Sequence, residues 1–265
     1  MEMKLWRSAV TFILMMSVIA CNLSLPSGRI VTPSPSPTPT LIPAEPSKPT
    51  PSLMAQLSAH EVVQRTAARL AELKSFHFSI RPRGNKPNVG GLLNTPLPVL
   101  LSTIEGDIVR PDQLRARVMV TILGTSAHLD LVRYQGETYL NNPLTGKWEK
   151  LPSEASHSLS PAVLFSPEQG LPTLLTGLKW NIVGFDEMQG VSTYHLQARD
   201  VPSVNLIGSG GTSEVIVDMW VGRETFLLYQ IRVDEQPTKR EGKTTWLLTL
   251  SAFDRPVVIT PPTIQ

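Results

Sequence analysis

Residues 114–122 read Leu-Arg-Ala-Arg-Val-Met-Val-Thr-Ile, with an apolar side chain at every second position. Successive side chains of a β-strand point to opposite faces, so the apolar residues share one face. They are Leu114, Ala116, Val118, Val120 and Ile122. One apolar face and one polar face are typical of an antiparallel strand with one side in water. This stretch predicts a sheet that packs on one side.

The same period of two returns in three other stretches. Residues 127–131, 227–234 and 245–252 each alternate apolar with polar side chains. Turn residues separate the stretches, among them Gly136, Gly146 and Gly190. We therefore expect one long antiparallel sheet.

Two segments show helical spacing instead. Residues 53–74 form the first, and Ser58 with Glu61 three positions later predicts a capping box at its start. The second lies within residues 160–178, where Leu171, Leu174 and Leu175 form an apolar stripe. A long sheet with two or three helices indicates an α+β fold. A curled sheet that few helices cover can enclose an apolar hollow. The Gly- and Pro-rich connection 84–103 is a candidate cover for its mouth.

The amino-terminal segment, residues 1–20, has the pattern of a signal peptide. Lys4 and Arg7 precede an apolar run over residues 9–19, which is shorter than the ~20 residues of a membrane-spanning helix. The run ends at Ala20-Cys21, and residues 18–21 resemble the bacterial lipobox. In such signals diacylglycerol is attached to the cysteine, which becomes the first residue after cleavage. We expect lipidation at Cys21, the single cysteine of the chain. The alternatives are an ordinary signal peptide or a short membrane helix with a chance cysteine.

Residues 21–52 follow as a linker rich in Pro, Ser and Thr. Proline fixes φ and lacks a backbone donor, so this composition predicts an extended spacer of ~3.1 Å per residue. A ligand for a proline-binding domain is the alternative. Residues 53–265 are then the globular domain, which is long enough for one core.

Composition excludes several functions. A formal net charge of +2 gives no basic stripe for nucleic acid. None of the histidines has zinc-site spacing, and neither a nucleophile elbow nor a phosphate loop occurs. The five histidines are His60, His77, His128, His157 and His195. We expect no enzyme, no cofactor and no metal, and we interpret His195 as structural. Trp148 and Trp220 are minor candidates for sugar contacts.

The order of several motifs resembles the LppX/LprA/LprF/LprG lipoproteins, a family that shares a half-barrel fold with the carriers LolA and LolB. The motifs are residues 106–112, 120–124, 136–140, 145–148, 160–164, 167–171, 174–178, 190–196 and 217–222. The resemblance spans residues 53–254. It implies a curved antiparallel sheet with helices on its concave face and a cavity for acyl chains. The long proline-rich linker and the 84–103 connection depart from the family pattern.

The resemblance implies a lipid-anchored protein on the extracytoplasmic side of the cell membrane. Such a protein binds an acylated lipid or glycolipid and carries or presents it across the envelope, with an envelope transport protein as a possible partner. Candidate lipid-binding residues lie on the apolar faces of the strands and on the second helical stripe. They are Val118, Val120, Ile122, Leu129, Leu131, Val163, Leu171, Leu174, Leu175, Val215, Val217, Met219, Leu227, Tyr229, Ile231, Leu248 and Leu250.

Two alternatives stay open. The same side chains suit a closed core, because protein interiors are close-packed. The chain would then be a structural or regulatory envelope lipoprotein that binds another protein. A hydrolase of envelope components is the weaker alternative, since the sequence shows no cluster of titratable groups for it.

Overall fold

The computed structural model describes residues 57–90, 95–141, 146–151, 164–166, 170–201, 215–235 and 243–264. All of them belong to a compact unit formed by residues 53–265, distinct from residues 1–52. The predicted signal peptide, Cys21 and the linker lie outside the described residues. No helix in the described ranges is both long and apolar enough to cross a bilayer.

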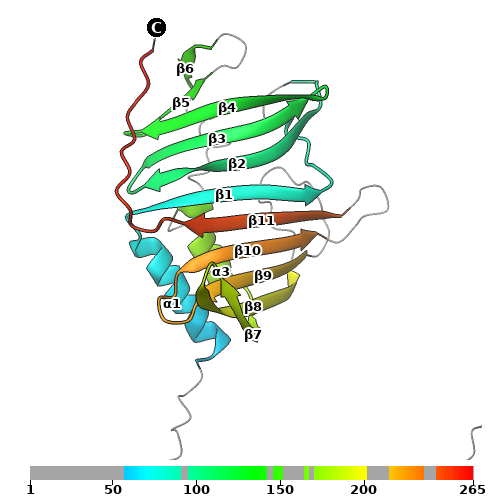
Figure 1. Cartoon of the computed structure of the whole chain (residues 1–265), viewed down its shortest axis with the longest axis vertical. Coiled ribbons are helices and arrows are strands. Elements are labelled where there is room, and N and C mark those ends of the chain that lie inside the picture. Colours follow the sequence, from blue (N-terminus) through cyan, green and yellow to red (C-terminus); the bar gives the residue numbers. More distant parts are fainter. Residues whose placement is uncertain are drawn as a thin grey trace, which may run out of the picture. The chain divides into compact units, whose positions relative to one another are not determined.

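One antiparallel sheet of eleven strands dominates the unit (Figure 1). The first six strands are β1 (Ser75–Gly84), β2 (Val99–Val109), β3 (Gln113–Ile122), β4 (Thr125–Tyr134), β5 (Glu137–Asn141) and β6 (Trp148–Lys150). The other five are β7 (Asn181–Met188), β8 (Val191–Val201), β9 (Val215–Gly222), β10 (Leu228–Glu235) and β11 (Thr244–Ser251). The spatial order is β6-β5-β4-β3-β2-β1-β11-β10-β9-β8-β7. Two meanders therefore join where β1 pairs with β11, and the sheet ends at β6 and β7 without closing.

The expected alternation is confirmed in β3. Leu114, Ala116 and Val120 are buried, whereas Arg115 and Arg117 are exposed on the opposite face. The face continues into β4 through the pairs Ala116↔Leu131 and Val118↔Leu129. A strand with one wet face and one packed face explains this period of two.

The first predicted helix is α1, Ala59–Glu72, and its capping box is present. The Ser58 side chain accepts a hydrogen bond from the Glu61 backbone N–H, and the Glu61 carboxylate accepts one from the Ser58 N–H. This reciprocal cap satisfies donors that the helix leaves free and sets its start at Ala59. The expected range 53–74 was thus too long at both described ends, since Leu57 and Leu73 lie outside the helix.

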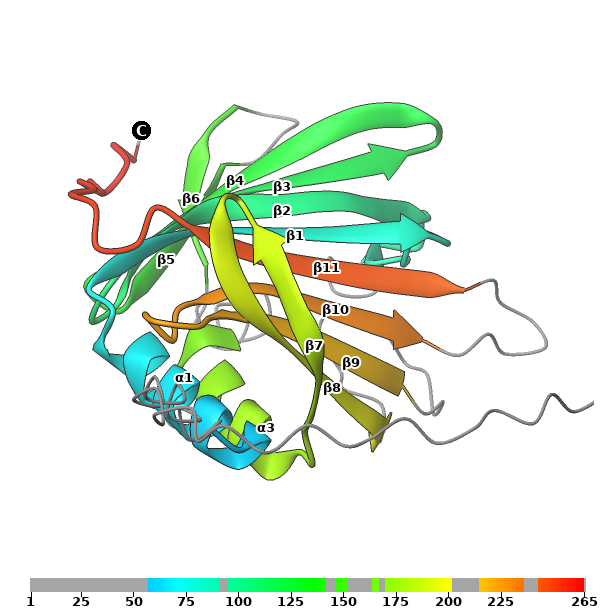
Figure 2. The same cartoon turned by 60° about the horizontal axis from the view of Figure 1, so that its bottom comes forward.

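The second predicted helical segment contains α3, Leu171–Gly177, and a single tight turn at residues 164–165. Residues 160–163 and 167–169 lie outside the described residues. Both helices lie against the half of the sheet formed by β1 and β7–β11, as Figure 2 shows. Their apolar side chains join one cluster with those of the strands, including Val62 and Leu70 from α1 and Leu175 from α3. The described chain is therefore mostly antiparallel sheet with few helices.

Candidate apolar pocket

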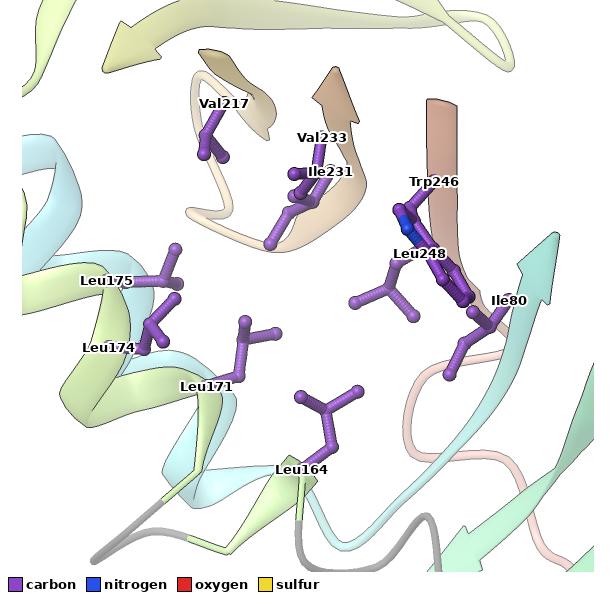
Figure 3. A pocket seen from close by; sticks show the side chains of 10 residues that line it. All are labelled: Ile80, Leu164, Leu171, Leu174, Leu175, Val217, Ile231, Val233, Trp246 and Leu248. Atoms are coloured by element: carbon purple, nitrogen blue, oxygen red, sulfur yellow. The ribbon is translucent and has the colours of Figure 1, made fainter. Parts of the chain in front are cut away.

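An apolar pocket lies between α3 and the sheet. About 500 Å³ between its walls is not occupied by atoms, open solvent included, but the centre of a water-sized sphere fits in only about 20 Å³ of it. Its lining residues are Ile80, Leu164, Leu171, Leu174, Leu175, Val217, Ile231, Val233, Trp246 and Leu248 (Figure 3). The single polar side-chain group among them, the Trp246 indole N–H, donates to the Glu235 carboxylate at 2.8 Å. The pocket therefore has no free polar side-chain group to fix a polar ligand.

Four adjacent strands form one wall. The register pairs Ile80 of β1 with Leu248 of β11, and Leu248 with Ile231 of β10. Val233 of β10 pairs with Trp246 on one side and with Val217 of β9 on the other. Directly paired side chains stand on the same face, so the wall is continuous across β1, β11, β10 and β9.

Helix α3 forms the opposite wall. Leu171, Leu174 and Leu175 are three and four positions apart, which places them on one helix face. The helix begins at Gly170, where an added Cβ would lie 2.4 Å from the Leu164 carbonyl oxygen and 2.5 Å from that of Ser166. Glycine therefore allows the 164–166 turn to pack tightly against the start of α3. At the other end the Trp180 indole N–H donates to the Leu175 carbonyl at 2.7 Å.

Phe165 anchors the 164–166 turn in the core. Its ring is 2 % exposed and lies 5.1 Å from the ring of Phe76 and 5.2 Å from that of Phe78, between centroids. The Arg110 guanidinium donates to the carbonyl oxygens of Phe165 and Leu70, both at 3.2 Å. Partial burial lowers the pKa of Arg110. These contacts place Leu164 at the pocket and link it to the end of α1.

Six of the predicted lipid-binding residues line this pocket: Leu171, Leu174, Leu175, Val217, Ile231 and Leu248. Five others, Val118, Val120, Ile122, Leu129 and Leu131, lie on β3 and β4 in the other half of the sheet. Val215, Met219, Leu227, Tyr229 and Leu250 are near the pocket strands in sequence but do not line it. Val163 lies outside the described residues.

Four lining residues were missing from the predicted set: Ile80, Leu164, Val233 and Trp246. Val233 and Trp246 have the same phase as Ile231 and Leu248, so extending the alternation by one step would have found them. Ile80 and Leu164 meet the others only through the β1–β11 pairing and the turn before α3. Leu227 precedes β10, whose register shifts between Leu228 and Gln230, and Leu228 is the buried residue instead.

A polar cluster occupies the opposite face of β8–β10. The Asp218 side chain is 1 % exposed and accepts hydrogen bonds from His195 (2.8 Å), Gln197 (2.9 Å) and Arg232 (2.8 Å). Burial alone would raise the pKa of Asp218, but these three donors and the Arg232 charge outweigh it and lower the pKa. A buried carboxylate with three donors is a stabilised anion, which joins three strands.

The two tryptophans considered for sugar contacts lie apart. Trp220 is 6 % exposed, its ring stacks on His195 with centroids 4.6 Å apart, and its indole N–H donates to Asp186 at 2.7 Å. Its ring faces offer little room for a sugar. Trp148 is half-buried on the edge strand β6. Among the described residues, no three His, Cys, Asp or Glu side chains come together to hold a metal.

Comparisons with known proteins agree with this architecture. The family model of the LppX_LprAFG lipoproteins matches residues 58–259. The structure of LprF from Mycobacterium bovis is similar, with a TM-score of 0.57 and 15 % identity over 77 % of this chain and 96 % of that one. Lipoprotein LppX from Mycobacterium tuberculosis has a TM-score of 0.52 and 18 % identity over 76 % and 97 %. No match was found among curated proteins.

Proposed function

Because the chain belongs to the LppX_LprAFG lipoprotein family, we propose that it is a membrane-anchored envelope lipoprotein that binds an acylated lipid or glycolipid. The apolar pocket between α3 and strands β1 and β9–β11 carries the proposal. An acyl chain needs no polar partner and gains ~0.8 kcal/mol for each methylene removed from water. A wall of Leu, Ile and Val side chains suits such a ligand and no polar one.

The size of the pocket limits what enters it. The centre of a water-sized sphere fits in only about 20 Å³ of it, and a single water molecule needs roughly 10–15 Å³ by the same measure. In this conformation the pocket holds on the order of one water molecule, so entry of an acyl chain requires α3 or the 164–166 turn to move away from the strands.

The proposed architecture is a half-barrel with α1 and α3 on the concave face of a curved sheet. Both helices lie on the same side of the β7–β11 half in Figure 2, and the leucines of α3 face the strands in Figure 3. In this arrangement α3 and the 164–166 turn act as the movable wall. The short helix and the single turn are the least extensive elements around the pocket.

Anchoring follows from the amino-terminal segment. We propose that residues 1–20 direct export, that diacylglycerol modifies Cys21 and that residues 21–52 tether the domain on the extracytoplasmic side of the membrane. Such a tether raises the effective concentration of the domain at the membrane, which favours uptake of a lipid from the bilayer. Delivery across the envelope, to a transport protein or another membrane, completes the proposed cycle. The proposal assigns no catalytic residue and no cofactor.

A closed core is the second candidate, and a specific observation favours it. Phe76 and Phe78 of β1 pack against Phe165 beside the pocket, and buried side chains of β2 and β3 continue this packed region. A domain whose interior is packed shut would act instead as a structural or regulatory lipoprotein that binds another protein through its surface.

Native mass spectrometry of residues 53–265, followed by lipid extraction, separates the two. One acylated lipid per chain, taken up from a membrane extract, supports the carrier. A mass without added lipid after exposure to that extract refutes lipid binding and leaves the closed core. Two experiments test the anchor. The wild-type protein should leave membranes only after its acyl chains are removed enzymatically, and the Cys21→Ser protein should be absent from membranes.

A further inference from the structure

One end of the sheet carries an exposed apolar patch that the pocket does not use. Leu123, in the turn between β3 and β4, is 73 % exposed, and Leu97, before β2, is 45 % exposed. The register pairs Val99 with Ile122, so the two segments lie side by side. We call the exposed Pro96, Leu97, Pro98 and Leu123, with the partly buried Ile122, the apolar tip. It lies at the end of the sheet where β1 and β3 end (Figure 1).

The backbone of this turn is unsuited to leucine. Leu123 has φ 49° and Gly124 has φ 83°, so both central residues of the two-residue hairpin turn adopt the left-handed region. Such turns strongly prefer Asn-Gly or Asp-Gly, because a leucine side chain crowds the backbone there. Leu123 thus adopts an unfavourable conformation and leaves most of its side chain in water. The turns at Gln135-Gly136 and Gln189-Gly190 have the same conformation with a polar side chain at the first position, so the turn itself does not require an apolar residue.

The two segments that carry the tip are almost free of charge. Residues 85–102 and 118–127 contain one charged side chain, Lys86, although 17 % of the whole chain is charged. Lys86 donates to the Ser102 hydroxyl at 3.2 Å, and Ser102 lies 3.5 Å from the Thr121 hydroxyl. Apolar side chains are therefore bordered by hydroxyl groups and one cation, without a carboxylate.

We propose that the apolar tip inserts into the interfacial layer of a phospholipid bilayer. A bilayer accepts leucine and proline side chains without a matched surface, its headgroups hydrogen-bond to hydroxyls, and its phosphates attract lysine. The absence of carboxylates from these segments favours this occupant over a protein partner, because the phosphates of a bilayer attract Lys86 and would repel carboxylates. The inference concerns the surface of β2–β4 and does not depend on lipid uptake by the pocket.

Spin-label accessibility on the full chain tests it. The full chain carrying Leu123→Cys is labelled with a nitroxide and reconstituted into phosphatidylcholine vesicles, with and without phosphatidylglycerol. The matched control is Val258→Cys, an exposed apolar position in the tail that follows β11. The unsubstituted chain measures any labelling of Cys21. Collisions with oxygen and with a nickel chelate then report whether each label lies in lipid or in water.

The label at position 123 is expected to collide several-fold more with oxygen, relative to the nickel chelate, than the label at position 258. Adding Leu97→Asp should return the label at 123 to water while the unfolding temperature stays unchanged. Equal accessibility at 123 and 258 would overturn the proposal, and so would an immersed label that ignores Leu97→Asp. Lipid uptake measured on the same samples tests the pocket separately, since immersion without uptake counts against the carrier function alone.

Discussion

Filling the pocket from the sheet side provides the sharpest test of lipid binding. Ile231 lies in the centre of the strand wall, paired with Leu248 on one side and Met219 on the other. In Ile231→Trp the larger ring extends from this position toward α3 and occupies the space meant for the ligand. The control is Leu129→Trp, on β4, which is half-buried and does not line the pocket.

The expected loss follows from the methylenes displaced. An indole ring in place of the isoleucine side chain takes the place of about four methylenes of an acyl chain, each worth ~0.8 kcal/mol. The binding free energy should weaken by about 3 kcal/mol, which raises Kd by roughly a hundredfold or more. The ring is larger than the space open in this conformation, so it should also cost about 1–3 kcal/mol of stability through overpacking.

Displacement of a fluorescent fatty acid measures Kd, and urea unfolding measures stability on the same proteins. Leu129→Trp should leave Kd within a few-fold of that of the unsubstituted protein. The reasoning is refuted if Ile231→Trp binds the probe normally. It is equally refuted if Leu129→Trp raises Kd as much as Ile231→Trp does.

Five other substitutions test the supports of the pocket and the surface. Phe165→Ala should cost about 3–5 kcal/mol in urea unfolding, because it empties a site between Phe76 and Phe78 and frees the turn that holds Leu164. Gly170→Ala should cost about 1–3 kcal/mol through its clash with the Leu164 and Ser166 carbonyls. Gly177→Ala, with no atom near the added Cβ, should be neutral or slightly stabilising, and equal effects would contradict the role given to Gly170. Leu123→Asn should stabilise the domain by about 1 kcal/mol in thermal unfolding, since asparagine tolerates the left-handed turn, and a loss would show that leucine packs there. The folded pKa of Asp218 is lowered, so its contribution to stability is present at neutral pH and is lost as the pH falls below its unfolded pKa of about 4. Asp218→Asn should therefore lower stability at pH 7 and flatten the acid side of a curve of stability against pH. An unchanged acid side would contradict this.

The strand pattern was predictable because burial on one side leaves a period of two in the residues themselves. Leu114, Ala116 and Val120 are buried in β3 as the alternation indicates, while Arg115 and Arg117 remain exposed. The capping box at Ser58 and Glu61 was predictable for the same reason, since a cap is a local contact between residues three apart. Local rules of this kind need no knowledge of distant partners.

The strand pattern did not predict which apolar residues line the pocket. Val120 and Ile231 have equally apolar strand environments in the sequence, yet only Ile231 lines the pocket. The difference arises because α3 lies over β9–β11 and not over β3, and this depends on the path of the chain between them. The pairing of β1 with β11, separated by about 170 residues, likewise brings Ile80 to Leu248.

The amino-acid sequence alone determined the class of this protein: the alternating strands, the capped first helix and the order of motifs that marks the lipoprotein family. The tertiary structure alone decided which half of the apolar face is hollow, and that Leu97 and Leu123 meet at one exposed tip. Hydrophobicity is a property of each side chain and is written in the sequence. Whether such a side chain meets a neighbour, a cavity or water depends on how distant segments pack, which no local pattern encodes.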